Sequence, residues 1–303
     1  MTEPLLNPKA MAEVRRPASR SRLNSAFVLG IGLGLAVGYH GLSFRWVWPP
    51  MNGLDRFLTI AVPAALTIEL VAGLQRVPRW AVWLLRMSLA ATIPRILLHG
   101  SVYLMSGSGG DWTPWQTATA LAICGALLAG LWGLLSWLSQ RCPGASIRLA
   151  LCLAIQCAGL TVMMAGYIKG GCAAFPLVAT LLATTVGAKL IAKRTGTQAD
   201  FGASAGLAMG VVGLFGVLFI GRFFGRLSTS CALAMLLAPL LCWVTEIPPL
   251  RHRKPWLVGS IRLVFVAIPL VVVLTLAKRD FDRDMAPLLG KLQESAIRRH
   301  VEG

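Results

Sequence analysis

The chain contains little charge for its length. Only 14% of its 303 residues are Asp, Glu, Lys or Arg, whereas 56% are hydrophobic. Soluble domains carry about 25% charged residues, so this composition excludes an ordinary soluble globular protein. Acidic residues are the scarcer kind, with 12 Asp and Glu against 29 Lys and Arg. The basic residues flank apolar runs and form no stripe interleaved with aromatics, so we expect no nucleic acid partner.

Sequence motifs of common enzymes and metal sites are also missing. The seven Cys include no C-x-x-C pair and the four His lie on separate segments, so we expect no disulfide framework, metal site or cofactor. No H-E-x-x-H motif and no carboxylate pair at catalytic spacing is present, and residues 106–111 match no intramembrane protease motif. We therefore predict no catalytic residues and favour a role without catalysis, while an enzyme acting on a lipid stays open.

Long apolar runs make up most of the chain. Each is close to the roughly 20 helical residues that cross a hydrocarbon core of about 30 Å. The runs are continuous rather than alternating, which predicts helices and not barrel strands. The sequence thus predicts an all-α integral membrane protein, a polytopic bundle of nine transmembrane helices. The predicted spans are 26–44, 57–74, 80–105, 116–138, 148–168, 172–192, 203–221, 228–245 and 256–277.

The distribution of Lys and Arg predicts the orientation. Residues 1–25 and the loops on their side of the membrane hold most of these residues, and cytoplasmic loops carry such an excess. We therefore predict a multi-pass protein of a cell inner (cytoplasmic) membrane with a cytoplasmic N-terminus. The basic tail 278–303 conflicts with this, because nine spans place it outside. Either the tail is translocated, helped by its three Asp residues, or segment 80–105 does not cross and the span count is eight.

The chain divides into three parts. Residues 1–25 are polar and basic and are predicted to be a disordered cytoplasmic segment, attracted by anionic lipid headgroups. Residues 26–277 form the transmembrane helical domain, whose first span is interpreted as an uncleaved anchor rather than a secretory signal. In the charged tail 278–303, a short amphipathic helix at the membrane surface and a frayed tail are both compatible with the sequence.

One ionisable pair inside the spans forms a specific structural hypothesis. Glu69 and Arg86 lie on the predicted spans 57–74 and 80–105, each six residues from the cytoplasmic turn that joins these spans. At a rise of 1.5 Å per residue, both are therefore about 9 Å from the cytoplasmic end of the helical hairpin. Ionisable groups at membrane depth usually face the protein interior with a partner. We predict that they pair. The pair would gate or couple transport, or fix the helical hairpin; alternatively, Arg86 extends to the membrane interface without pairing.

Other polar residues in the spans are weaker candidates for an intramembrane polar site. Arg95 and His99 share a helical face, where they would contact an anionic substrate or lipid, or Arg95 would extend to the interface. Lys189 has the same two interpretations. Gln156 and Thr184 would bind a substrate or hydrogen-bond within the bundle.

Small residues recur at four-residue spacing in several spans. Such stripes let helices in lipid pack closely, either within one chain or between two copies. The clearest stripes are Gly30, Gly34 and Gly38, and Gly202, Gly206 and Gly210.

These observations leave function open between classes. The leading hypothesis is a permease-like protein that binds or moves a small solute or lipid between its helices. The alternative is a non-catalytic subunit or scaffold of a larger membrane complex, with other membrane protein subunits as partners. A transporter would contain a polar cavity near the membrane midplane, a scaffold would expose a glycine-lined groove, and an enzyme would hold an acid-base pair at headgroup depth.

Overall fold

The computed structural model describes residues 8–44, 48–74, 77–104, 113–141, 145–195, 203–246 and 255–301. Within these ranges the protein is all helical and contains no strand. The α-helices are α1 (Pro8–Gly41), α2 (Gly53–Arg56), α3 (Val62–Ala72), α4 (Arg79–Leu98), α5 (Pro114–Arg141), α6 (Ser146–Met164), α7 (Ile168–Cys172), α8 (Ala174–Thr195), α9 (Ala203–Phe224), α10 (Thr229–Leu237) and α12 (Pro255–Val301). A π-helix, η1 (Phe57–Ala61), precedes α3, and a 3₁₀-helix, η2 (Ala238–Glu246), follows α10.

Eight helices in the described part of the chain are long and apolar enough to cross a membrane, which indicates a membrane-embedded, multi-pass protein. The predicted span 57–74 is not among the eight. Segment 80–105, suspected of not crossing, supplies one of them as Arg79–Leu98, so its length and composition suit a crossing. Pro94 lies buried inside this helix without ending it.

A wide helical turn explains why 57–74 differs from the other predicted spans. The segment follows α2 directly, but its helix is divided at Phe57–Ala61, where the Val62 N–H donates to the Phe57 carbonyl five residues earlier. Pro63 comes next and has no N–H to continue the regular ladder. The wide turn leaves Phe57 fully buried against Gly216 of α9.

Helix α9 lies at the centre of the bundle, and every residue from 205 to 221 is buried. Its glycines allow this, because side chains of neighbouring helices occupy the space where a Cβ would be. Gly206 faces Arg148 and Gly210 faces Leu151, both on α6. The predicted small-residue stripe in this helix therefore packs within the chain; Gly202 lies outside the described residues.

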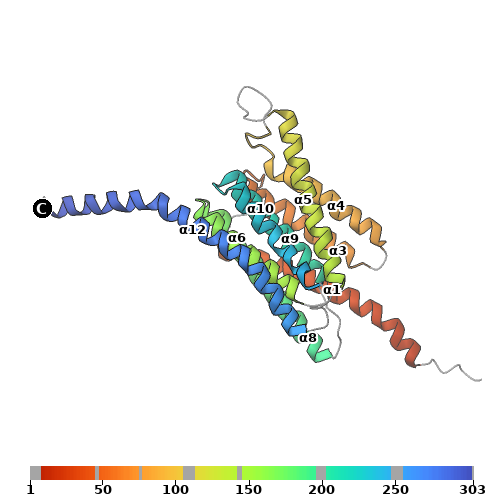
Figure 1. Ribbon diagram of the computed structural model, residues 1–303. Coiled ribbons are helices and arrows are strands. Elements are labelled where there is room, and N and C mark those ends of the chain that lie inside the picture. Colours follow the sequence, from red (N-terminus) through yellow and green to blue (C-terminus); the bar gives the residue numbers. More distant parts are fainter. Residues whose placement is uncertain are drawn as a thin grey trace, which may run out of the picture.

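Helix α1 also packs closely against α8 through its glycines. Gly34 is close to Thr180 and Gly38 to Pro176, while Gly30 has open space where a Cβ would be. The helix begins at Pro8 and extends beyond the bundle (Figure 1). Residues 1–25 were predicted to be disordered, and their described part, from Pro8 onward, is helical in this structure; it is rich in Ala and Arg, which favour helix.

Helix α12 corrects the expectation for the tail. It runs without interruption from Pro255 to Val301, packs on α6 and η2, and then leaves the bundle (Figure 1). The described part of the tail from residue 278 is therefore neither a separate short helix nor a frayed end, because it continues the helix of the apolar span through Pro287 and Gly290.

The bundle has two ends, which we name after an arginine at each. At the Arg86 end, α3, α5 and α8 finish and α4, α6, α9 and α12 begin. At the Arg226 end, α6 and α9 finish and α8 and α10 begin.

The contact between Gly216 and Phe57 gives a test of the packing. In Gly216→Ala the new Cβ overlaps the Phe57 ring, and such overpacking costs about 1–3 kcal/mol. We expect a lower temperature at which the detergent-solubilised protein loses its monodisperse peak in size-exclusion chromatography. Gly187→Ala on α8 is the control, since open space surrounds that position. Phe57→Leu in the Gly216→Ala background should restore part of the loss; unchanged stability of Gly216→Ala would refute this packing.

Candidate functional site

Glu69 and Arg86 form the ion pair that the sequence predicted. Arg86 Nε donates to Glu69 Oε1 at 2.8 Å, and Nη2 donates to Oε2 at 2.9 Å. The Ser204 hydroxyl, from the start of α9, donates to Oε2 at 2.6 Å and accepts from Arg86 Nη2 at 2.7 Å. The guanidinium also lies 5.4 Å from the Trp83 ring centre and 5.8 Å from that of Trp132. The network joins α3, α4 and α9.

The two charged side chains of this network are buried. The Glu69 side chain is 1% exposed and that of Arg86 is 10% exposed. The adjoining cavity, lined by Asn24 and Gly73 among others, has a volume of about 50 Å³. That is room for water but not for a solute, since one water occupies about 30 Å³. The geometry supports a structural role in joining three helices.

A second buried arginine network lies at the same end of the bundle, and the sequence analysis missed it. Arg262 Nε donates to Thr245 Oγ1 at 2.6 Å, and its Nη1 donates to Ser146 Oγ at 3.1 Å. Its Nη2 lies 3.5 Å from Glu246 Oε1. The sequence did offer the feature that indicated Arg86, namely a cationic residue inside a predicted apolar span, because Arg262 lies in the span 256–277.

The structure does not bring the remaining sequence candidates to this network. Arg95, His99 and Lys189 are exposed on the surface, and Gln156 and Thr184 are half-buried on different helices. The Thr184 hydroxyl donates to a backbone carbonyl of its own helix at 2.8 Å. Of the seven predicted polar residues, only Glu69 and Arg86 bond to each other in the described structure.

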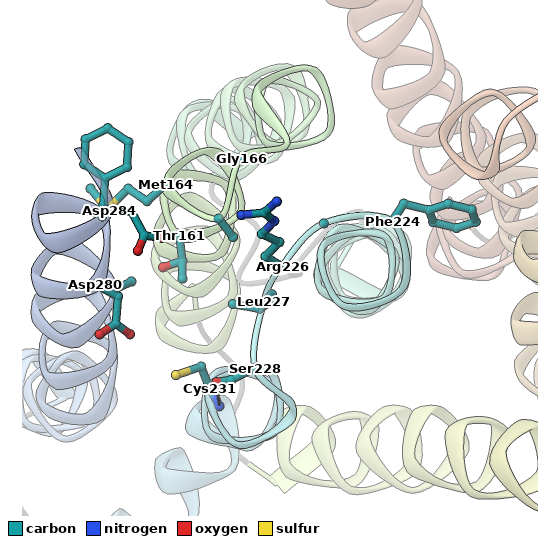
Figure 2. Close-up of a pocket in the computed structure, with 14 residues that line it drawn as sticks. Thr161, Met164, Gly166, Phe224, Arg226, Leu227, Ser228, Cys231, Asp280 and Asp284 are labelled. Carbon is teal, nitrogen blue, oxygen red and sulfur yellow. Dashed lines mark hydrogen bonds between the residues drawn. The ribbon is translucent and has the colours of Figure 1, made fainter. Parts of the chain in front are cut away.

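A larger candidate site is a cleft at the Arg226 end, which no sequence pattern indicated. It lies between the end of α6, the connection between α9 and α10 (residues 225–228, the α9–α10 connection) and α12 (Figure 2). Its volume is about 700 Å³. Ligand sites typically measure about 300–1,000 Å³. This Arg226 cleft is lined by Thr161, Met164, Ala165, Gly166, Phe224, Gly225, Arg226, Leu227, Ser228, Cys231, Ala277, Asp280, Phe281 and Asp284.

Backbone hydrogen bonds hold the wall that carries the cation. The Arg226 N–H donates to the Ala165 carbonyl at 3.2 Å, which ties the α9–α10 connection to the end of α6. The next residue, Leu227, is buried and donates its N–H to the Gly221 carbonyl at 3.2 Å. Arg226 therefore projects into the cleft from a fixed backbone (Figure 2).

The opposite wall of the Arg226 cleft carries carboxylates. Asp280 and Asp284 lie one turn apart on α12, on the face turned toward the α9–α10 connection (Figure 2). Both are exposed, as is Arg226. Among the residues that the structure describes, none forms an ion pair with these three side chains. The cleft can therefore offer charge of both signs to a ligand.

A second, apolar cleft is lined by residues at the end of α9 and the start of α10, next to the α9–α10 connection. It has a volume of about 260 Å³ and is walled by α5, α9 and α10, with Leu127, Phe215 and Leu233 among its lining residues. Arg222 stands at its edge, and Arg222 Nε donates to Thr229 Oγ1 at 2.7 Å. This second cleft has the lining expected for an acyl chain.

Comparison with known proteins found no family model, no curated protein and no solved structure that matches this chain. The conclusions about function therefore depend on the geometry of the site alone.

The Glu69–Arg86 network generates a test of its structural role. Removing one partner of a buried ion pair costs about 3–5 kcal/mol, because the other charge is left buried and unpaired. We expect Glu69→Gln and Arg86→Gln each to destabilise the protein strongly, and the double variant to lose less than the sum. Unfolding in mixed SDS and neutral detergent measures this. Ser204→Ala removes only hydroxyl bonds and should cost about 1 kcal/mol; additive losses for the two charges would contradict the pairing.

Proposed function

We propose that this protein is permease-like and binds a small solute or lipid in the Arg226 cleft. The observation that carries the proposal is an open cleft of about 700 Å³ that Arg226 lines on one side of the α6 end and Asp280 and Asp284 on the other. Charged groups that are exposed at the ends of membrane helices need no partner, since water solvates them. Their convergence on one cavity from two separate elements supports ligand binding.

The proposal assigns no ligand to the predicted polar site. Glu69 and Arg86 satisfy each other and Ser204. A solute entering there would have to break these bonds in a nearly dry environment. The Arg226 cleft requires no such rearrangement, because its charged side chains are already exposed.

The proposal includes an orientation in a cell inner membrane. The N-terminus and the Arg86 end face the cytoplasm, because most Lys and Arg of the loops lie on that side. The helical stretch formed by α2, η1 and α3 is the ninth crossing, which the direction of the chain between α1 and α4 supports. On this topology the Arg226 cleft and the tail lie on the outer side.

Cys231 provides a direct test of the cleft, because its free thiol is half-buried in the lining. We expect a membrane-impermeant maleimide to modify Cys231 in sealed cells, at a site identified by peptide mass spectrometry. Buried Cys152 and Cys242 are the internal controls and should stay unmodified. In purified protein, a lipid extract or members of a solute panel should slow the modification of Cys231 about tenfold, since a bound ligand covers the thiol.

A cleft-filling variant separates ligand protection from general effects. Ala277→Trp places an indole in the cleft and should abolish protection by the extract or solutes, whereas Leu276→Trp on the lipid-facing side should not. Modification only in inverted vesicles would overturn the orientation. Protection by no compound, or equal protection in both Trp variants, would overturn ligand binding in the Arg226 cleft.

A groove on another face supports the second candidate, a scaffold or subunit of a larger complex. The groove lies between α1 and α3, has a volume of about 630 Å³ and is almost wholly apolar. Gly30, Gly32 and Leu33 line one wall and Pro63 and Leu66 the other. Exposed glycines allow close approach of a transmembrane helix from a partner subunit.

The groove makes a separate prediction. If a partner helix occupies it, Gly30→Leu fills the space and should dissociate the complex, which size-exclusion chromatography of mild-detergent extracts from native membranes would detect. Gly130→Leu is the control, because that position on α5 is equally open but lies outside the groove. An unchanged elution profile for Gly30→Leu would exclude the groove as an assembly surface.

A further inference from the structure

The charges of the Arg226 cleft constrain the chemistry of its ligand. The lining contains one cation, Arg226, and two anions, Asp280 and Asp284. A ligand that carries only negative charge would meet two carboxylates, and one that carries only positive charge would meet the guanidinium. A neutral ligand with both charges satisfies both walls.

The two carboxylates offer a place for a cation between or beside them. Like charges four residues apart on a helix repel each other, and both of these project into the same cleft (Figure 2). Asp282 lies between them in sequence but is not part of the lining, because two residues turn it to another side of α12. An ammonium group with several N–H donors could bridge Asp280 and Asp284 by charge-assisted hydrogen bonds.

The cation on the facing wall suits an oxyanion. A guanidinium presents a planar fork of donors that matches phosphate or carboxylate oxygens. The Arg226 backbone is tied to Ala165, so the residue that carries this fork has a fixed place in the lining of the cleft. Met164, Leu227 and Phe281 add apolar surface to the same cleft. A group that contains phosphate and ammonium next to apolar carbon matches each of these features.

We propose that the Arg226 cleft selects a phosphoethanolamine group, with the phosphate on Arg226 and the primary ammonium on Asp280 and Asp284. This inference rests on the proposed function, because it names the ligand class of the same cleft. The group is available from a membrane phospholipid or from a soluble glycerol ester. A trimethylated ammonium has no N–H to donate, so phosphatidylcholine binds less well, and anionic phosphatidylglycerol binds least.

Native mass spectrometry of the full-length protein in neutral detergent tests the selection. The probes are phosphatidylethanolamine, phosphatidylcholine and phosphatidylglycerol with identical acyl chains. We expect phosphatidylethanolamine to bind at least about tenfold more tightly than phosphatidylglycerol, the effect of about one charged contact. The double variant Asp280→Asn, Asp284→Asn should abolish this preference. Arg226→Gln should weaken the binding of phosphatidylethanolamine about tenfold. Asp282→Asn is the matched control and should bind as the unaltered protein does.

The outcomes separate this inference from the proposed function. If phosphatidylglycerol binds as tightly as phosphatidylethanolamine or more tightly, and Ala277→Trp still blocks this binding, the zwitterion selection is overturned but the cleft remains a binding site. If Ala277→Trp blocks the binding of none of the three lipids, both the zwitterion selection and the proposed ligand binding in the cleft are overturned. A preference that survives the double Asp variant would also refute the inference. Displacement of the lipid by glycerophosphoethanolamine identifies the soluble ester as a ligand, and failure to displace it identifies the lipid.

Discussion

Lipid does not solvate charge, and this constraint governs how the buried polar groups of the bundle are arranged. An unpaired ionisable group at membrane depth costs several kcal/mol. Arg86 is therefore held by Glu69 and Ser204, and Arg262 by Thr245, Ser146 and Glu246. Both networks join helices that are distant in sequence. Because the bonds are directional, they determine which residues of the helices face each other, which apolar packing alone specifies less strictly.

At the opposite end of the bundle, the charged groups of the Arg226 cleft are exposed rather than buried. Arg226, Asp280 and Asp284 are exposed and face a common cavity without an ion pair among the described residues. Where helices end, water solvates such groups, so the fold does not require partners for them. Arg86 and Arg262 thus join helices, whereas the three charges of the Arg226 cleft form no ion pair among the described residues.

The parts of this structure that could be predicted from sequence are those that repeat or that carry a single strong constraint. Hydrophobic length identified the helical membrane class, and depth matching identified Glu69 and Arg86 as partners because only one turn separates their helices. The wide turn at Phe57–Ala61 could not be predicted, since it depends on the fit of Phe57 against Gly216, far away in the chain. The Arg226 cleft was missed for the same reason. Its walls come from α6, the α9–α10 connection and α12, and no spacing in the sequence relates them.

If the Arg226 cleft binds phosphoethanolamine as proposed, the neighbouring apolar cleft favours a lipid over a soluble ester as its source. The α9–α10 connection, residues 225–228, lines the charged cleft, and the residues on either side of it, Phe223 and Thr229, line the apolar cleft. Arg226 lines the first, and Arg222, one turn earlier, stands at the edge of the second. A soluble ester would use only the charged cleft. A phospholipid has both a charged headgroup and acyl chains, so a lipid held at this end of the bundle has a suitable surface for each part within a few residues of the same connection.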